Sequence, residues 1–320
     1  MKRIAIIGSG ISGIGAAYAL KDTADVTLFE AQDRLGGHAC THVFDYDGHE
    51  TAVDLGFIVY NGLNYPNLIG LFDALDVETQ ESDMSFAVSD RDGWEWASTA
   101  RGIFAQKRNL FSLDFHRFWR TILKFNDLAR AELAAGRIED TTLGDWLDFH
   151  GFDQAFRCNY ILPMGAAIWS TPEVGMLDYP ARSFFQFFEN HRLMHKERPQ
   201  WRTVTGGSQS YVNAAAAELG DRVRTGTPAI RVFPFGDKIT VVTEDNRSHI
   251  FDDVILATHS DQALRLVEKG FEDQSFLLRS VHYRPNTIYL HRDPALMPSR
   301  RNAWASWNVI KQDNGDICLS

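Results

Sequence analysis

The stretch from Arg3 to His38 constrains the fold of this chain more than any other part of it. It begins with an apolar run, residues 4–7, of the composition that a buried parallel strand needs. Three glycines, an alanine-rich helical pattern and a second apolar run at residues 26–29 follow in that order. Strand, glycine-rich turn, helix and strand in succession predict an α/β fold with a parallel sheet.

The three glycines lie at G-x-G-x-x-G spacing, at Gly8, Gly10 and Gly13. In a dinucleotide site the first glycine permits the tight turn, the second lets the backbone approach a pyrophosphate, and the third lets the helix pack against the strand. The helix N-terminus then faces the negative charge. Glu30, twenty residues after Gly10, would accept a hydrogen bond from a ribose hydroxyl and repel a 2′-phosphate, which disfavours NADP.

Two other interpretations of this stretch were weighed against a dinucleotide site. A glycine-rich turn in some other α/β protein would share the spacing and remains open at this point. A signal peptide would explain Lys2 and Arg3 before an apolar run, but three glycines break that run and a second strand pattern follows directly. We therefore reject the signal peptide.

Composition and charge exclude several classes of protein. The chain has 320 residues, of which 44% are hydrophobic and 23% charged, as in ordinary globular proteins. Its formal charge of −10 argues against a general nucleic-acid binder. No apolar run approaches the roughly 20 residues of a spanning helix. The three cysteines are scattered without metal or redox spacing, so we expect a cytoplasmic protein with no metal site.

A pair of glycines, Gly36 and Gly37, marks a second place where the backbone approaches something closely. A site for NAD alone has no particular need of this loop. An extended flavin dinucleotide passes it on the way out of the nucleotide crevice. The pair therefore favours FAD over NAD.

The segment RLGGH followed by DLGFIVYN resembles the flavin-containing amine oxidoreductase superfamily, which includes monoamine oxidases, phytoene desaturases and protoporphyrinogen oxidases. The usual pattern there is E-A-x-x-R-x-G-G-R followed by D-x-G. In this chain His38 replaces the last arginine, so a cationic contact to the cofactor phosphates becomes pH-dependent or is lost. Ala229 takes the place of a valine in the strand that flanks adenine. By this resemblance the FAD contacts also include Ile11, Ser12, Glu30, Ala31, Gln32, His38, Leu55, Gly56, Phe57 and Ile58.

Other segments, among them YPNLIGLFDALDVET, IFAQKRNL and RPQWRTVTGGSQSYV, are similar to one branch of this superfamily. Its members are predicted NAD/FAD-binding oxidoreductases that are similar to the N-terminal domain of plant cyclopropane-fatty-acyl-phospholipid synthases. The resemblance implies an FAD-dependent oxidoreductase that passes a hydride from an apolar, lipid or fatty-acyl substrate to the flavin. Superfamily members continue beyond the equivalent of Ser320, so we expect a C-terminally truncated chain, either a fragment or a shortened relative, that lacks part of its cofactor contacts.

The expected architecture has two discontinuous domains. Residues 1–70 and 204–275 form a Rossmann-like FAD-binding domain, and residues 71–203 and 276–320 form an α+β substrate domain. Strand-like runs at residues 287–291, 303–309 and 317–320 predict an antiparallel sheet in the second domain.

Candidate substrate contacts lie mostly in the middle of the chain. Helical spacing of apolar residues from Ser112 predicts a core-facing stripe, with Arg117, Arg120 and Lys124 either solvated or facing an acyl chain or membrane surface. The basic run at residues 191–202 is either a solvated face or an anionic headgroup site. The small residues beside Trp169 admit either a planar ring or tight helix packing. The candidates are Tyr60, Trp169 and Trp201.

The chemistry is expected to come from the flavin, since no Ser/His/Asp triad or carboxylate pair indicates another mechanism. No catalytic base is assigned. Two alternatives remain: a non-redox flavoprotein isomerase or mutase, and a non-catalytic FAD-binding partner of a lipid-modifying methyltransferase. Peripheral membrane contact is compatible with each of them.

Overall fold

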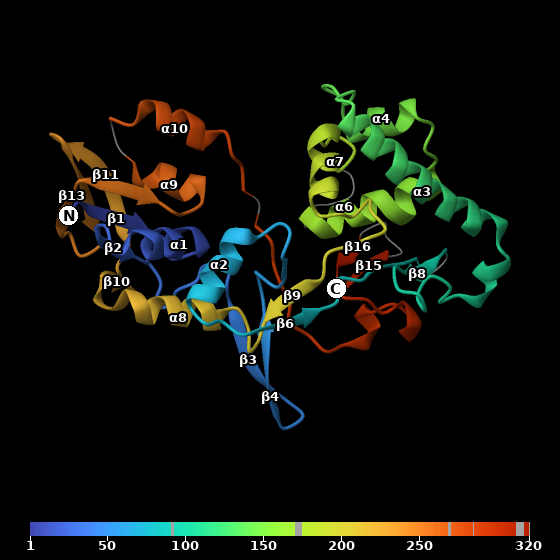
Figure 1. Cartoon of the computed structure of the whole chain (residues 1–320), viewed down its shortest axis with the longest axis horizontal. Helices are drawn as coiled ribbons and strands as arrows, with labels where there is room; N and C mark the ends of the chain where they lie inside the picture. Colours follow the sequence, from blue (N-terminus) through green and yellow to red (C-terminus); the bar gives the residue numbers. More distant parts are fainter. Residues whose placement is uncertain (91–92, 170–174, 268–269, 284, 312–316, 320) are drawn as a thin grey trace. The chain divides into compact units, whose positions relative to one another are not determined.

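A computed structural model describes the chain except residues 91–92, 170–174, 268–269, 284, 312–316 and 320. The chain divides into two compact units (Figure 1). Unit 1 comprises Met1–Tyr60, Tyr65–Glu81 and Arg202–Ile288, and unit 2 comprises Asn61–Asn64, Ser82–Trp201 and Tyr289–Ser320. The expected boundaries at residues 70 and 275 differ from these, because residues 71–81 and 276–288 lie in unit 1.

A parallel four-stranded sheet in the order β10-β2-β1-β14 forms the centre of unit 1. Both neighbours of β1 pair with it over its whole apolar run, Ile4 lying opposite Val26 on one side and Asp253 on the other. The predicted α/β fold with a Rossmann-like domain is confirmed. The strands are β1 (Arg3–Ile7), β2 (Asp25–Phe29), β10 (Val223–Arg224) and β14 (Asp253–Leu256).

Two different layers cover the faces of this sheet (Figure 1). Helices α1 (Ile11–Leu20) and α8 (Gln209–Leu219) pack on the face that carries Ile4 and Ile6. The other face, with Ala5 and Ile7, packs against the antiparallel sheet β11-β12-β13. A sheet buried on both faces needs apolar residues in succession, which is the pattern that β1 shows. The covering strands are β11 (Ala229–Phe235), β12 (Lys238–Thr243) and β13 (Ser248–Phe251).

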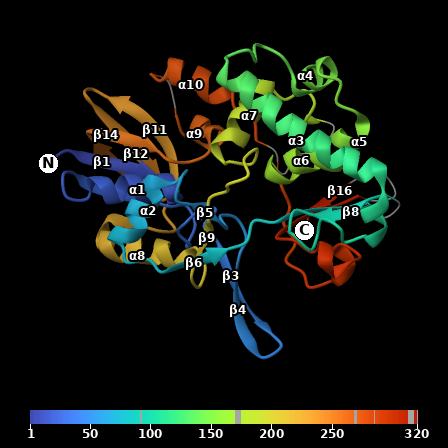
Figure 2. The same cartoon turned by 45° about the vertical axis from the view of Figure 1, so that its right-hand side comes forward.

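A two-stranded hairpin, β3 (Thr41–Tyr46) with β4 (His49–Asp54), extends from unit 1 in both views (Figures 1 and 2). Its turn has positive φ angles at Asp47 (53°) and Gly48 (88°). Two positive φ angles are typical of the tight turn that matches strand twist. The remaining elements of unit 1 include α2 (Pro66–Ala74), η4 (Gly220–Arg222), α9 (Ser260–Leu266) and α10 (Glu272–Arg279).

A further three-stranded sheet has the order β5-β9-β6. Its strands are β5 (Tyr60–Asn61), β6 (Thr79–Ser82) and β9 (Trp201–Val204). Each strand contains a residue pair at which the chain passes from one unit to the other.

Unit 2 contains a sheet in the order β16-β15-β7-β8, with helices over one face (Figures 1 and 2). Side chains from α3, α4, α6 and α7 meet Phe86, Val88, Trp96 and Val309 of the sheet in an aromatic-rich core. Ser112 caps α3, its Oγ accepting from the Phe115 amide at 3.2 Å. The strands are β7 (Phe86–Ser89), β8 (Glu95–Ala97), β15 (Trp307–Lys311) and β16 (Ile317–Leu319). The helical segments are η1 (Lys107–Phe111), α3 (Leu113–Ala134), α4 (Leu143–Phe149), α5 (Gln154–Phe156), η2 (Arg157–Ile161), α6 (Leu162–Trp169), α7 (Ala181–Asn190), η5 (Pro294–Leu296) and η6 (Arg301–Ala303).

The predicted C-terminal strands are partly wrong. Residues 287–291 form no strand, and Ile288 and Tyr289 are 59% and 79% exposed. Alternating apolar residues form a strand only where another strand pairs with them, and no strand among the described residues pairs with residues 287–291. Residues 301–303 form η6, so the next strand starts at Trp307. β15 pairs antiparallel with β16 as expected, but it pairs parallel with β7, so the sheet is mixed.

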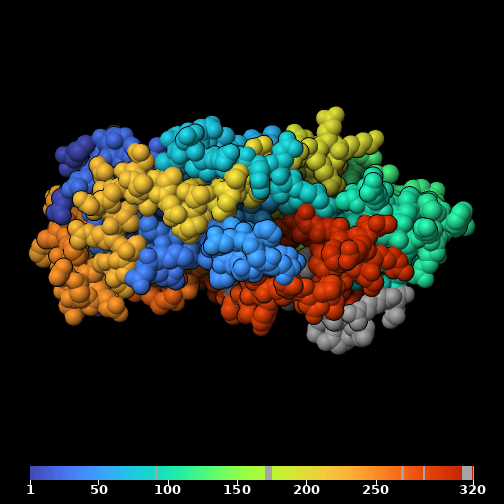
Figure 3. Space-filling view, turned by 90° about the horizontal axis from the view of Figure 1, so that it is seen from below, coloured from blue at the N-terminus to red at the C-terminus, as the bar shows by residue number. Residues whose placement is uncertain are grey.

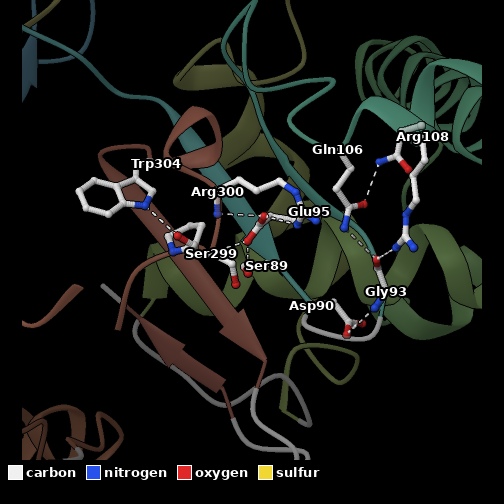
Figure 4. Close-up of polar contacts among 11 residues, drawn as sticks. Ser89, Asp90, Gly93, Glu95, Gln106, Arg108, Ser299, Arg300 and Trp304 are labelled. Atoms are coloured by element: carbon white, nitrogen blue, oxygen red, sulfur yellow. Dashed lines mark hydrogen bonds and ion pairs between the residues drawn. The ribbon is translucent and has the colours of Figure 1, made fainter. Parts of the chain in front are cut away.

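A buried carboxylate joins the C-terminal part of unit 2 to β8 (Figure 4). Glu95 is 2% exposed and accepts four hydrogen bonds. Oε1 accepts from Ser89 Oγ (2.8 Å) and the Ser299 amide (2.7 Å). Oε2 accepts from the Arg300 amide (3.2 Å) and guanidinium (2.8 Å). The charge is thus compensated by donors in residues 299–300, which fixes that segment against the sheet.

Candidate cofactor site

A cavity of about 840 Å³ lies within unit 1 at the carboxyl ends of β1, β2 and β14. Ligands of open parallel sheets bind at this edge, and the volume falls within the roughly 300–1,000 Å³ that is typical of cofactor and ligand sites. The lining residues lie within residues 7–12, 29–39 and 257–266, together with Phe57, Tyr65, Leu68, Tyr211 and Ala229.

The glycines of the first loop have different neighbours. Gly8 has a φ of +102°, and a Cβ there would lie 2.8 Å from the Ala257 carbonyl oxygen. A Cβ on Gly13 would lie 1.8 Å from the carbonyl oxygen of Gly8. These two glycines are therefore required by the packing of the chain on itself. A Cβ on Gly10 would meet no protein atom within 4 Å, and its φ of −64° suits any residue.

The N-terminus of α1 offers hydrogen-bond donors to the cavity. Gly10 is the N-cap residue and has no side chain to cap the first turn. The amides of the first turn have no acceptors within the helix. Together with the positive end of the helix dipole they form an anion site, next to the open space at Gly10.

Glu30, at the end of β2, organises the loops around the cavity. Its Oε2 accepts from the amide and hydroxyl of the buried Ser9, at 2.9 and 2.5 Å. Its Oε1 accepts only from the Gln32 amide, at 2.9 Å, among the contacts of the described residues. Because a carboxylate oxygen has two lone pairs, Oε1 keeps acceptor capacity for a ribose hydroxyl.

The second glycine pair packs against the first loop. A Cβ on Gly37 would lie 3.0 Å from Gly10 Cα, and one on Gly36 would lie 2.6 Å from the Ala39 carbonyl oxygen. Arg34 donates to the carbonyls of Gly37 (2.9 Å) and Ala39 (3.1 Å), which fixes the loop. The Gly36–Gly37 pair predicted a close backbone approach, and in the structure the backbone at Gly37 approaches the backbone at Gly10.

His38, where the superfamily has arginine, is exposed at the cavity. Its ring stacks on His259, with centroids 5.4 Å apart, and His259 stacks on Tyr283 at 4.4 Å. Arg34 and Arg265 also line the cavity, and Arg265 is paired with Asp261 at 3.1 Å. The imidazole of His38 thus occupies the arginine position without a permanent charge.

The aromatic wall of the cavity includes Tyr65 and Tyr211. Burial raises the pKa of Tyr65, and burial together with the nearby Asp54 carboxylate raises the pKa of Tyr211 to about 12. Phe57 and Phe72 pack against the Tyr211 ring at 6.4 and 5.2 Å. Both phenols therefore stay neutral at physiological pH.

Most of the residues expected to contact the cofactor line this cavity. Four of the expected residues do not line the cavity. Two of these, Gly13 and Gly56, lie behind the cavity wall. A Cβ on Gly56 would lie 2.2 Å from the His38 carbonyl oxygen. Leu55 and Ile58 are also absent from the lining. The expected residues that do line it are Gly8, Gly10, Ile11, Ser12, Glu30, Ala31, Gln32, Gly36, Gly37, His38, Phe57 and Ala229.

Sequence reasoning missed the contribution of α9 and the loop before it. Residues 257–259 follow β14, and Gln262, Arg265 and Leu266 lie on α9. Ligands bind beyond the carboxyl ends of parallel strands, so this loop is indicated once β14 is known to pair with β1. Arg34 belongs to the quoted RLGGH motif but was not expected as a contact, and Tyr65 and Tyr211 had no comparable signal.

Of the candidate substrate residues, Tyr60 is 3% exposed and packs on Phe72 with centroids 5.3 Å apart in unit 1. Trp169 and Trp201 lie in unit 2, where successive half-buried rings connect them. We call Trp169, Phe187, His191 and Trp201 the aromatic ladder; its successive centroid distances are 5.0, 4.0 and 6.2 Å. Residues 170–172, part of the motif beside Trp169, lie outside the described residues.

The basic run near the ladder is partly neutralised by Glu189. This carboxylate accepts from His195 at 2.9 Å and lies 3.8 Å from both Arg130 and Arg192. Among the described residues, no three His, Cys, Asp or Glu side chains are grouped as a metal site would require. None of the helices in the described part of the chain is long and apolar enough to cross a membrane.

A family model described as flavin containing amine oxidoreductase matches residues 11–292. The chain belongs to this family. Tryptophan 2-monooxygenase of Pseudomonas savastanoi is 26% identical over 322 aligned positions, which cover 87% of this chain and 56% of that protein. The chain thus spans little more than half the length of this relative.

Solved structures share the fold. Cyclohexylamine oxidase from Brevibacterium oxydans has a TM-score of 0.67 at 21% identity, covering 87% of this chain and 63% of that one. A fatty acid isomerase from P. acnes that produces CLA has a TM-score of 0.56 at 17% identity, with the same two coverages. At this level of identity the likeness concerns the fold alone.

FAD is the cofactor that the family implies, and the residues of the cavity fit it. The uncapped first turn of α1 suits a pyrophosphate, and the open space at Gly10 lets it come close. Glu30 Oε1 suits a ribose hydroxyl, and Ala229 lines the place expected for adenine. The fit covers the dinucleotide part of FAD.

Proposed function

We propose that this chain binds FAD in the cavity of unit 1 and acts as an FAD-dependent oxidoreductase on an apolar, lipid-like substrate. The observation that carries the proposal is Gly10. Nothing in the protein requires a glycine there, whereas a ligand bound against the α1 N-terminus does.

The residues of the cavity have distinct parts in this proposal. The first-turn amides of α1 hold the pyrophosphate, and Glu30 orients the ribose through Oε1. Phe57, Tyr65 and Tyr211 form a neutral wall that keeps water from the cofactor. Bound FAD supplies an isoalloxazine ring that accepts two electrons and a proton from the substrate.

The substrate class is proposed from unit 2. The aromatic ladder offers half-buried ring faces, which suit an acyl chain, and the carboxylate nearest to it in sequence, Glu189, is already paired with cations. An ammonium substrate would lack a free counter-charge at Glu189. The fatty-acyl class also rests on the resemblance of segments such as IFAQKRNL to relatives of cyclopropane-fatty-acyl-phospholipid synthases. Several of the relatives are named after amines or amino acids, so the test includes both substrate classes.

Anaerobic reduction of the purified protein tests this proposal. The 320-residue chain is loaded with FAD and mixed with an oleoyl phospholipid, with tryptophan and with cyclohexylamine, while flavin absorbance is followed. We expect bleaching by the phospholipid alone. Bleaching by the amines alone would refute the proposed lipid substrate but would still support the proposed oxidoreductase activity.

Two further outcomes would refute the proposed oxidoreductase activity itself. Bound flavin that no substrate bleaches, with a shifted double bond in the recovered lipid, indicates an isomerase. Bound flavin that is never reduced but stimulates an added lipid methyltransferase indicates a binding partner. Failure to bind FAD at all refutes the assignment of the cavity.

A further inference from the structure

The charges of this chain are unevenly distributed. Residues 101–124 carry six Lys or Arg side chains and one acidic side chain, Asp114, a formal charge of +5. The rest of the chain carries 26 basic and 41 acidic side chains, a formal charge of −15. All six basic residues of this segment are exposed. A basic surface on an acidic protein attracts an anionic partner.

Large apolar side chains lie exposed within the same segment. Phe111, at the end of η1, is 89% exposed, and Leu113, the first residue of α3, is 78% exposed. Leu110 beside them is 46% exposed. In Figure 3 this teal-to-green segment lies open at the right-hand end of the face in view. Leu110, Phe111 and Leu113 lie at the corner where η1 is followed by α3. Adjacent exposed apolar side chains of this kind are typical of a binding surface.

Hydrogen bonds hold the corner in place. His116 Nε2 donates to the Leu110 carbonyl at 2.8 Å, and Ser112 caps α3. Gln106 and Arg108 both donate to the Gly93 carbonyl, at 3.3 and 2.8 Å (Figure 4). Phe111 and Leu113 are thus presented on a fixed backbone.

The two faces of α3 differ in kind. Phe115, Phe118, Ile122 and Phe125 are buried in the core of unit 2. Leu113, Arg117, Arg120 and Lys124 follow each other at helical spacing on the exposed side. Arg117 contacts Asp114 at 3.2 Å, and Lys124 lies over the Phe152 ring at 5.4 Å. We call the exposed residues Lys107, Phe111, Leu113, Arg117, Arg120 and Lys124 the basic face.

We propose that the basic face docks on an anionic lipid bilayer. Phe111 and Leu113 enter the boundary between headgroups and acyl chains, and the flanking cations contact lipid phosphates. Apolar side chains among Lys and Arg distinguish this surface from one for a soluble anion, which offers nothing to the apolar pair. The inference stands independently of the flavin site, because it concerns other residues in the other unit.

Vesicle sedimentation tests the proposal with the full chain. The wild type is mixed with sucrose-loaded vesicles of phosphatidylcholine alone or with added phosphatidylglycerol. We expect binding that requires phosphatidylglycerol and weakens with salt. The double variant Arg117→Gln/Arg120→Gln should bind about 25-fold more weakly, since each basic residue near the surface contributes roughly fivefold. Phe111→Ser/Leu113→Ser should weaken binding at least tenfold.

The matched control is Phe276→Ser/Leu277→Ser, which removes an equally exposed apolar pair (78% and 66%) from α10, beside Glu272 and Asp273. It should bind as the wild type does. All the substituted side chains are exposed, and circular dichroism checks that each variant folds. In addition, Phe111→Trp should show blue-shifted fluorescence only with phosphatidylglycerol present.

Several results would overturn the proposal. These are no binding to anionic vesicles, equal loss in the α10 control, and equal binding to phosphatidylcholine alone. A wild type that dimerises in the ultracentrifuge while Phe111→Ser/Leu113→Ser is monomeric would assign the basic face to a second copy of the chain.

Discussion

Replacing Gly10 with alanine should change the affinity for flavin without changing the stability of the fold. The added Cβ meets no protein atom within 4 Å and the backbone is already in an extended conformation. Losing glycine at the N-cap costs about 0.5–1 kcal/mol. Alanine also has less conformational freedom than glycine in the unfolded chain, which stabilises the folded state by about 0.4–1 kcal/mol. The free energy of unfolding of the apoprotein should therefore change by less than about 0.5 kcal/mol.

Flavin affinity should fall sharply in the same variant. The methyl group occupies the space through which a pyrophosphate reaches the α1 amides. Losing one hydrogen bond to a charged group costs about 1.5–3 kcal/mol, which raises Kd about 10- to 150-fold. Titration of apoprotein with FAD, followed by quenching of flavin fluorescence, measures this change, and urea unfolding measures stability.

Two neighbouring glycines serve as controls. A Cβ on Gly15, within α1, also meets nothing within 4 Å, so Gly15→Ala should gain about 1 kcal/mol of stability and leave Kd unchanged. Gly13→Ala should lose about 3 kcal/mol, because its Cβ would lie 1.8 Å from the Gly8 carbonyl oxygen. If Gly10→Ala binds FAD as tightly as the wild type, the assignment of the pyrophosphate site is wrong.

Three further predictions concern stability, pH and substrate. Glu95→Gln should lower the free energy of unfolding by about 1–3 kcal/mol in urea titrations, because the neutral amide offers one acceptor oxygen in place of the two that the buried carboxylate offers to its four hydrogen-bond donors; an unchanged midpoint would contradict this. Tyr160 and Tyr211 have pKa values of about 12, raised by burial, against about 10 in an unfolded chain. Unfolding free energy should therefore be unaffected by these phenols below pH 10 and fall as pH rises from 10 to 12; a Tyr160→Phe/Tyr211→Phe variant that loses stability as steeply as the wild type between pH 10 and 12 would refute this. Trp201→Ala should slow flavin reduction by lipid at unchanged flavin content, whereas Trp304→Ala, outside the aromatic ladder, should not.

The sequence predicted best what neighbouring residues determine. The positive φ at Gly8 and the acid that follows β2, Glu30, belong to one strand-turn-helix-strand motif, and the structure has both. Such features can be predicted because the motif is continuous in sequence and each of its residues has a defined task.

Pairings between distant segments were not predictable in this way. β15 pairs parallel with β7, and no local pattern specifies that partner or that direction. The run at residues 287–291 alternates as a strand does, yet no strand pairs with it. The cavity wall formed by α9 likewise depends on a distant pairing, because α9 follows β14 in the chain and β14 pairs with β1. Glu95 gave no sign of burial, because its donors at Ser299 and Arg300 come from far along the chain.

The position of β1 in the middle of its sheet has a consequence for synthesis of the protein. Lys2 precedes β1 and Asp253 begins β14, the strand that pairs with β1, and the two residues are 251 positions apart. At about 5–20 residues per second, a ribosome needs roughly 12–50 s to make the intervening chain. During that time one edge of β1 has no partner, and the cavity lacks the wall that residues 257–266 provide. We therefore expect the cofactor to be captured late, after most of the chain has emerged, so that flavin supply governs the final step of maturation and not its start.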